Sequence, residues 1–305
     1  MKITVIGAGN VGATAALFLL QKQLGDVVLF DIVEGLPQGK ALDMMEAAPV
    51  LGFETKITGT NAYREIKDSG LVIVTAGLAR KPGMTREDLL KKNASIIKDV
   101  VINIKEYAPQ AFILMVTNPL DVMTYYALKV SGFSRQRVFG QAGVLDGARF
   151  ACFIAEKLNV PVKDVKPLVL GGHGDSMLPL ARLSSFQDKP LTECLGQKEL
   201  DPLIERTRQA GAEIVGLLKT GSAYYSPAAS AVHMAEAVVR EQKTILPASV
   251  YLDGEYGLRD ICIGVPVRLG KNGVEEVIEL DLTPEEKNAL HQSAAVYQKA
   301  IQLLE

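Results

Sequence analysis

Lys2-Ile3-Thr4-Val5-Ile6-Gly7-Ala8-Gly9-Asn10-Val11-Gly12 stands at the start of the chain and decides its fold. Residues 3–6 are apolar or β-branched, which is typical of a short buried strand, and residues 13–20 read as a buried helix. The glycines between them follow the G-x-G-x-x-G pattern of a strand-turn-helix unit. In such a unit Gly7 permits the tight turn, Gly9 lets a phosphate approach the backbone, and Gly12 lets the helix pack on the strand. The sequence therefore predicts a dinucleotide-binding unit of the Rossmann type.

A second apolar run, Val27–Phe30, ends in Asp31, nineteen residues after Gly12. At that spacing a carboxylate can accept both hydroxyl groups of a ribose, and it disfavours a 2′-phosphate. The free N–H groups at the start of the preceding helix would face the pyrophosphate. We therefore expect NAD as the cofactor, and we expect its site to include Gly7, Gly9, Asn10, Val11, Gly12 and Asp31. A glycine turn that only closes a strand-to-helix corner is the structural alternative.

Length and composition favour a two-lobed globular protein that acts on small molecules. The chain has 305 residues, of which 48% are hydrophobic and 22% charged, and its net charge is −2. Because the charges of both signs are interspersed, we expect no nucleic-acid and no membrane partner. The N-terminal strand leaves no room for a signal sequence and no apolar run is long enough to span a bilayer, so we expect a cytoplasmic protein.

Two further apolar runs predict strands that are buried on both faces, at residues 71–75 and 112–116. Between them, Arg86–Tyr107 carries an apolar stripe at helical spacing. In a doubly wound parallel sheet the carboxyl ends of the strands form the ligand crevice, so both strand ends, Val116 included, should lie beside the cofactor.

The pattern changes after residues 138–139, where helical and β-rich stretches alternate. We expect an α/β protein with an N-terminal Rossmann domain, residues 1–142, and a C-terminal α+β substrate domain, residues 143–305. The expected helices cover residues 147–158, 201–219 and 228–240, a last helix follows Thr283-Pro284, and β-rich pieces cover residues 165–170, 249–252, 261–269 and 274–278.

His173 is the first candidate for acid–base chemistry. It lies in Leu170-Gly171-Gly172-His173-Gly174-Asp175-Ser176, directly after an apolar run. Glycines around a histidine let the backbone approach a ligand and leave the ring open, and an imidazole suits proton transfer at neutral pH. A histidine that only completes a turn is the alternative interpretation.

Asp146 and Arg149 form a second candidate group, three residues apart near an expected helix start. At that spacing the acid could orient a histidine while the arginine grips a carboxylate through its planar fork. A helix N-cap with a surface arginine is the structural alternative.

Ala79-Arg80-Lys81-Pro82-Gly83-Met84-Thr85-Arg86 places positive charge at the expected crevice. A loop of this kind is typical of a lid that closes on an anion, and a solvated basic turn is the alternative. The three cysteines, Cys152, Cys194 and Cys262, lack metal-ligand spacing, so we expect structural thiols and no metal.

Taken together, these motifs resemble the lactate and malate dehydrogenase family over essentially the whole chain, and within it most resemble the lactate dehydrogenase-like malate dehydrogenases. Besides the glycine turn, the resemblance rests on four stretches: Asn118-Pro119-Leu120-Asp121, Leu145-Asp146-Gly147-Ala148-Arg149-Phe150, Gly172-His173-Gly174-Asp175-Ser176 and Gly264-Val265-Pro266-Val267.

The resemblance implies reversible NAD-dependent oxidation of (S)-malate to oxaloacetate, with lactate and pyruvate as the alternative substrate pair. It implies that His173 carries the proton, with Asp146 as its partner, and that Arg86 polarises the substrate carbonyl. It also implies that Arg149 and Asn118 bind substrate, that Asn93, Val116 and Asn118 contact the cofactor, and that the Asn118–Pro119 bond is cis.

Arg80 matches the specificity position of the lid, where lactate dehydrogenases usually carry glutamine. An arginine there suits the second carboxylate of oxaloacetate and, left unpaired in a closed site, disfavours pyruvate. The resemblance further implies a homodimer or homotetramer. Apolar helix faces at residues 15–20 and 228–239 would suit subunit contacts, but burial within one chain would explain them equally well.

Two other classes remain open at this point. An NAD-dependent glycosidase could share the dinucleotide unit but would need a metal, for which the sequence offers no ligand set. A protein that only senses NAD would leave His173, Asp146 and the arginines without a role.

Overall fold

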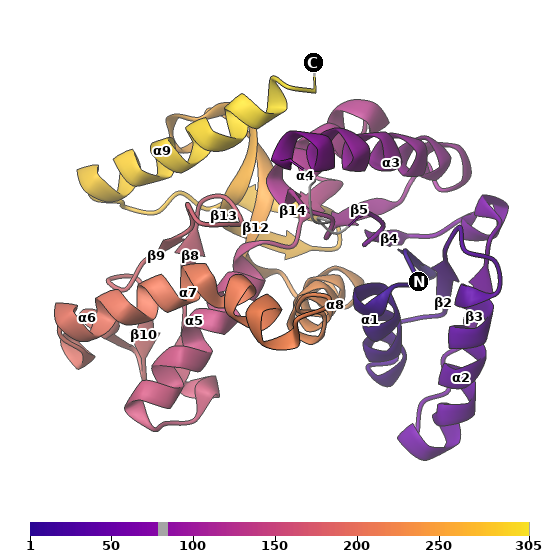
Figure 1. Ribbon diagram of the computed structural model, residues 1–305, viewed down its shortest axis with the longest axis horizontal. Helices are drawn as coiled ribbons and strands as arrows, with labels where there is room; N and C mark the ends of the chain where they lie inside the picture. The colour runs from indigo at the N-terminus through magenta and orange to yellow at the C-terminus, as the bar shows by residue number, and fades with distance from the viewer. Residues whose placement is uncertain (79–84, 305) are drawn as a thin grey trace.

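The computed structural model describes residues 1–78 and 85–304, and a doubly wound parallel sheet forms its centre (Figure 1). Six strands run parallel in the order β3-β2-β1-β4-β5-β6. They are β1 (Ile3–Ile6), β2 (Val27–Phe30), β3 (Ile57–Thr60), β4 (Leu71–Val74), β5 (Phe112–Met115) and β6 (Val138–Gly140). This is the strand order of a Rossmann sheet, so the predicted N-terminal fold is confirmed.

Helices cover both faces of this sheet. In Figure 1, α3 (Arg86–Tyr107) and α4 (Leu120–Ser131) lie on one face, and α1 (Asn10–Gln21) lies on the other with α8 (Tyr225–Val239). The helix α2 (Leu36–Leu51) flanks the β3 edge. A capping box between Thr85 and Asp88 starts α3, because each side chain satisfies a free backbone N–H of the other residue.

The sheet continues into the C-terminal half. The strands β12 (Thr244–Asp253), β13 (Arg259–Gly270) and β14 (Gly273–Val277) are antiparallel to one another, and β12 joins β6 through the pair Ser249 and Gly140. Among the described residues, β1–β6 and β12–β14 therefore form one nine-stranded sheet, beside two small sheets of three and two strands. Sequence patterns alone indicated two halves but not this continuity.

The remaining C-terminal elements surround the antiparallel strands. They are the helices α5 (Gly143–Leu158), α6 (Leu191–Cys194), α7 (Gln197–Leu218) and α9 (Pro284–Ile301); the short strands β7 (Val165–Lys166), β8 (Val169–Leu170), β9 (Leu178–Pro179), β10 (Ser185–Phe186) and β11 (Lys189–Pro190); and the 3₁₀ turns η2 (Val162–Asp164) and η3 (Glu255–Gly257). A further 3₁₀ turn, η1 (Tyr63–Ile66), belongs to the N-terminal half, between β3 and β4.

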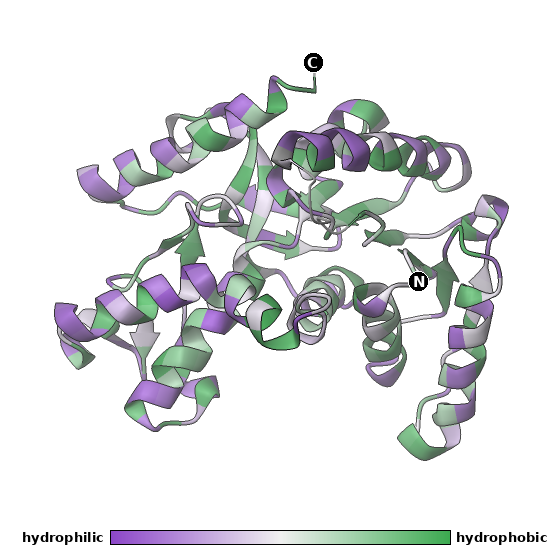
Figure 2. Cartoon of the chain, viewed as in Figure 1, coloured by the Kyte–Doolittle hydropathy of each residue, from purple (hydrophilic) through white to green (hydrophobic). Residues whose placement is uncertain are grey.

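Both halves share one apolar core. Its buried residues run from Ile3 on β1 to Ile301 on α9, and a smaller cluster around Phe150 and Leu191 lies beside it. Figure 2 shows the apolar strands inside, with polar residues on the outward faces of helices such as α7. Since burial of apolar area is the main favourable term in folding, this shared core fixes how the two halves meet.

Several predicted bounds were inexact. Residues 165–170 form two short strands in different sheets, separated by Pro167, which has no N–H to donate to a sheet. The helix expected from residue 147 begins at Gly143, and the helix expected from residue 201 begins at Gln197, so each has one more turn at its start than the sequence pattern indicated.

The apolar faces of α1 and α8 pack against each other within the chain. Ala15, Leu19, Ala231 and Ala235 are fully buried there. Burial within one chain thus accounts for these faces. No helix in residues 1–78 and 85–304 is both long and apolar enough to cross a membrane.

Candidate active site

The glycine turn between β1 and α1 has the shape that a dinucleotide requires. Gly7 has a φ of +103°, and a Cβ on Gly12 would lie 1.8 Å from the carbonyl oxygen of Gly7. A Cβ on Gly9, by contrast, would meet nothing within 4 Å, so the backbone faces open space there. The helix begins at Asn10 and has no side-chain cap on Gly9. Its first N–H groups therefore suit a pyrophosphate.

Asp31 stands beside this turn. Its Oδ2 accepts a hydrogen bond of 2.7 Å from the N–H of Ala8, and its Oδ1 accepts one of 3.0 Å from the N–H of Val33. Carboxylate oxygens have further lone pairs, so both can still accept ribose hydroxyls. The cradle of glycines and the placement of Asp31 fit NAD.

Asn93 lies on α3 and connects the ends of β4 and β5. Its side chain is 1% exposed; Oδ1 accepts from the N–H of Leu78 at 2.8 Å, and Nδ2 donates to the carbonyl oxygen of Asn118 at 2.7 Å. Val116 follows β5 directly and is half-buried, and the Asn118–Pro119 bond is cis, as implied by the family resemblance. Asn93 is thus placed to hold the crevice edge in shape.

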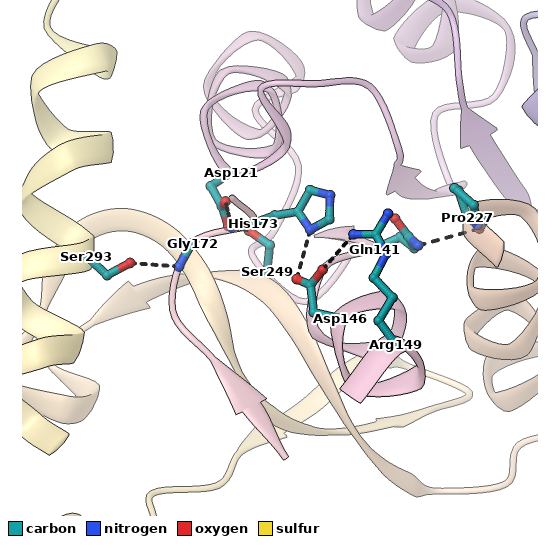
Figure 3. Close-up of polar contacts among 9 residues, drawn as sticks. All are labelled: Asp121, Gln141, Asp146, Arg149, Gly172, His173, Pro227, Ser249 and Ser293. Atoms are coloured by element: carbon teal, nitrogen blue, oxygen red, sulfur yellow. Dashed lines mark hydrogen bonds and ion pairs between the residues drawn. The ribbon is translucent and has the colours of Figure 1, made fainter. Parts of the chain in front are cut away.

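His173, on the loop after β8, and Asp146, on α5, form a close pair (Figure 3). His173 Nδ1 lies 2.8 Å from Asp146 Oδ2, and the side chains are 13% and 2% exposed. Asp146 lies in the first turn of α5, which begins at Gly143, so Asp146 is not an N-cap as the structural alternative supposed. The helix instead aims the carboxylate at the imidazole.

Arg149 completes a three-residue cluster. Its Nη1 lies 3.3 Å from Asp146 Oδ1, and its side chain is 13% exposed rather than on the surface. Within the described ranges, Arg149 Nε is the buried side-chain nitrogen that has no hydrogen-bond partner. A buried guanidinium with unused donors is suited to bind a carboxylate.

The electrostatics of the cluster favour a charged histidine. Burial lowers the pKa of His173, but the charge of Asp146 and its hydrogen bond outweigh burial, so the net pKa is raised above its ordinary value. Arg149 acts in the opposite direction on the imidazolium. Burial also lowers the pKa of Arg149, against the attraction of Asp146.

Sequence reasoning quoted Asp121 but assigned it no role. This aspartate, at 0% exposure on α4, accepts a hydrogen bond of 2.7 Å from the backbone N–H of His173. Its other oxygen accepts one of 2.7 Å from Ser249 Oγ on β12. A signal was present in the sequence, since Asp121 stands alone in an otherwise apolar helical turn.

His173 opens onto a cavity of about 620 Å³ between the start of α3, the start of α4 and α9. Asn118, Ser176 and Tyr297 are among its lining residues. Arg86 is the first residue of α3, at the edge of this region, but its side chain lies outside the described part of the structure. Arg80 lies outside the described residues altogether.

Comparison with known proteins identifies the family. Residues 1–140 match the lactate/malate dehydrogenase NAD binding domain, and residues 143–305 match the alpha/beta C-terminal domain of the same family. A malate dehydrogenase of Chlorobium limicola is 56% identical over 300 residues, which make up 98% of this chain and 97% of that protein.

Solved structures agree with this match. A malate dehydrogenase from Salinibacter ruber is 50% identical with a TM-score of 0.96, over 100% of this chain and 97% of that one. A lactate dehydrogenase from Cryptosporidium parvum, complexed with lactic acid and the NAD cofactor, is 43% identical with a TM-score of 0.96, over 99% and 97%. Because both of its halves match, this chain is a member of the lactate/malate dehydrogenase family.

Proposed function

We propose that this protein is an NAD-dependent malate dehydrogenase that interconverts (S)-malate and oxaloacetate. The observation that carries the proposal is the cluster of His173, Asp146 and Arg149, in which a histidine at the edge of a cavity and a buried guanidinium contact the same carboxylate. A 2-hydroxy acid needs both groups, one for its hydroxyl and one for its carboxylate. The bound NAD supplies a nicotinamide ring that takes up or gives back a hydride.

His173 is the proposed acid–base catalyst. Asp146 occupies Nδ1, so Nε2 is the ring nitrogen left for the substrate. In malate oxidation neutral His173 takes the hydroxyl proton, and in oxaloacetate reduction the imidazolium returns it. Asp146 keeps the ring in one tautomer and stabilises its positive charge, as the acid of a catalytic triad does.

The arginines have separate proposed tasks. Arg149 holds the carboxylate next to the reacting carbon through bidentate hydrogen bonds. Arg86 stabilises the negative charge that develops on the substrate oxygen, and Asn118 contacts the substrate beside it. Gly7, Gly9, Asn10, Val11, Gly12, Asp31 and Asn93 are proposed to hold NAD, with Val116 and Asn118 next to the nicotinamide.

Arg80 is proposed to select oxaloacetate over pyruvate. The fold cannot make this distinction, because a malate and a lactate dehydrogenase both superpose on the chain with a TM-score of 0.96. A second guanidinium in a closed site pairs with the second carboxylate of oxaloacetate and has no partner when pyruvate binds. Lactate dehydrogenase activity is the alternative on these grounds.

We also propose a homo-oligomer, dimeric or tetrameric, located in the cytoplasm, with a domain boundary between residues 142 and 143. Support for subunit contacts comes from α2, which has two buried residues, Pro37 and Ala41, and exposes Leu42 and Val50 at 62% and 87%. Contiguous patches of exposed apolar side chains mark interfaces between subunits, and these side chains would contribute to such a patch. Light scattering of the purified protein would give the number of subunits.

The test of the activity is the initial rate of NADH oxidation with oxaloacetate, repeated with NADPH and with the variant His173→Asn. We expect turnover with NADH, a much lower rate with NADPH because Asp31 repels the 2′-phosphate, and a loss of about 100-fold or more in the variant. A variant as active as the wild type would remove His173 from the mechanism. A protein that bound NADH but turned over no 2-oxo acid would be an NAD sensor instead.

A further inference from the structure

Two consecutive backbone N–H groups of the histidine loop are bound by buried side chains from different elements. Asp121 on α4 accepts from the N–H of His173 at 2.7 Å, and Ser293 on α9 accepts from the N–H of Gly172 at 3.0 Å. Ser293 Oγ also lies 2.9 Å from Ser176 Oγ at the other end of the loop. The loop that carries His173 is therefore fixed from both sides.

Asp121 differs from Ser293 because it brings a charge. It has 0% exposure, and each of its carboxylate oxygens accepts one hydrogen bond. One comes from the N–H of His173 and the other from Ser249 Oγ on β12. Burial raises the pKa of Asp121 to about 6, although both hydrogen bonds lower it. Asp121 is thus mostly ionised at neutral pH, so it acts on the imidazole as a second carboxylate near His173.

The groups that interact with these two residues come from every neighbouring element. Asp121 interacts electrostatically with His173 on the loop, Asp146 on α5, Cys262 on β13 and Tyr297 on α9. His173 is influenced by Asp146 and Asp121, which favour its protonated form, and by Arg149, which opposes it. Asp121 is the member of this set that bonds to the backbone of the catalytic residue itself.

We propose that Asp121 is a positioning residue for His173, which fixes the histidine backbone and adds a negative charge that helps the imidazole to hold its proton. Figure 3 shows the arrangement: Asp121 binds the backbone of His173 while Asp146 binds the ring. The inference rests on the proposed function, in which His173 carries the proton.

A purely structural role would explain the same hydrogen bonds, since Asp121 also connects α4 with β12. The two interpretations differ in what they predict for an amide. In Asp121→Asn, the side-chain oxygen can still accept from the N–H of His173 while the NH₂ group faces Ser249, whose hydroxyl oxygen can accept. This variant therefore keeps the bonds and removes the charge, whereas Asp121→Ala removes both.

The experiment combines kinetics with titration of the histidine rings by NMR. The chain has three histidines, so the ring of His173 can be assigned by its loss in His173→Asn. The carboxylate control is Glu236→Gln. Glu236 is also buried, at 8% exposure, but it pairs with Lys22 and lies nine residues, about 14 Å along α8, beyond Pro227 beside the site.

We expect Asp121→Asn to keep kcat near the wild-type value at low pH and to lower the pKa of His173, by less than Asp146→Asn does, because the charge of Asp146 acts more strongly on the imidazole. The alkaline limb of kcat/KM for oxaloacetate reduction should move to lower pH by the same amount. We expect Asp121→Ala to lower kcat by about tenfold or more with little change in KM, because the ring loses its alignment. Glu236→Gln should change neither kcat nor the pKa of His173.

An unchanged pKa of His173 in Asp121→Asn would overturn the charge part of the proposal. A folded Asp121→Ala with wild-type kcat would overturn the positioning part. If Asp121→Ala does not fold, Ser249→Ala decides that part, since it removes one tether of Asp121 and should lower kcat several-fold. The titration is read without turnover, so it stays informative even if wild-type protein proves inactive with oxaloacetate, a result that would contradict only the proposed function.

Discussion

Asp146 binds two groups with one nearly buried carboxylate, and most of the chemistry of the site follows from this. One oxygen lies 2.8 Å from His173 Nδ1 and the other 3.3 Å from Arg149 Nη1. A single α-helical turn delivers both Asp146 and Arg149, since residues three apart share a face. The ring is oriented and its charged form is stabilised before substrate binds.

The pH dependence of the reaction follows from the pKa of His173, which is raised mainly by Asp146 against the effect of burial. Oxaloacetate reduction needs the imidazolium, so we expect its kcat/KM to be highest at low pH and to fall as pH rises through the raised pKa. Malate oxidation should change in the opposite direction. Asp146→Asn should lower kcat by about 100-fold or more and move both limbs to lower pH.

Steady-state pH profiles in both directions check this prediction. Glu236→Gln again provides a matched acid-to-amide change away from the site. Profiles of Asp146→Asn that coincide with those of the wild type would mean that another group sets the pKa of His173.

Truncation of Arg149 and of Arg86 to alanine should change different kinetic constants. Arg149→Ala removes a contact to a carboxylate that is present throughout the reaction, so we expect KM for oxaloacetate to rise by about 100-fold, with a smaller effect on kcat. Arg86→Ala removes a charge that acts mainly on the developing oxyanion, so we expect kcat to fall sharply. Steady-state and single-turnover kinetics separate the two effects, and the reverse pattern would exchange the assigned roles.

Arg80 lies outside the described residues, and steady-state kinetics can test its role in substrate selection. We expect Arg80→Gln to shift the ratio of kcat/KM for oxaloacetate and pyruvate towards pyruvate, by about tenfold or more, because the second carboxylate loses its partner. Arg80→Lys keeps the positive charge and serves as the control. A ratio that stays constant in Arg80→Gln would place substrate selection elsewhere.

At the scale of elements, the glycine turn shows how one motif combines two physical requirements. Gly12 permits close packing inside the protein, while Gly9 leaves room outside it. A Cβ at Gly12 would come within 1.8 Å of a backbone oxygen, whereas a Cβ at Gly9 would have no neighbour within 4 Å.

These two glycines provide a matched pair of variants. We expect Gly9→Ala to leave the melting temperature unchanged and to weaken NADH binding, because the methyl group occupies the space for the phosphates. We expect Gly12→Ala to lower the melting temperature by several degrees, because the turn or the helix must shift. Thermal melts and NADH fluorescence titrations check both, and equal melting temperatures in the two variants would contradict the packing argument.

Periodicity predicted the elements well where the chain packs regularly. Arg86–Tyr107 was expected from one apolar stripe and is α3 with the same bounds, and Val27–Phe30 is β2. Periodicity does not predict which distant elements contact each other, or through which residues. Nothing local in Asp121 indicates that it binds a backbone N–H fifty-two residues away, and nothing local in Ser249 indicates that it pairs with Gly140 to join the sheets.

At the scale of the whole molecule, one sheet and one core connect the cofactor turn with the proton carrier. The glycine turn follows β1, His173 follows β8, and β12 joins the parallel and antiparallel parts of the sheet beside Asp121. The relative position of NAD and substrate is thus set by packed structure. Substrate preference, by contrast, depends on a few side chains, which is why related folds serve malate and lactate alike.

The most direct test of the central claim is a competition in one vessel. Equal concentrations of oxaloacetate and pyruvate are given to the protein with limiting NADH, and malate and lactate are measured after the NADH is consumed. The product ratio is the ratio of the two kcat/KM values. We predict an excess of malate of about 100-fold or more. An excess of lactate, or NADH left unconsumed, would contradict the assignment as a malate dehydrogenase.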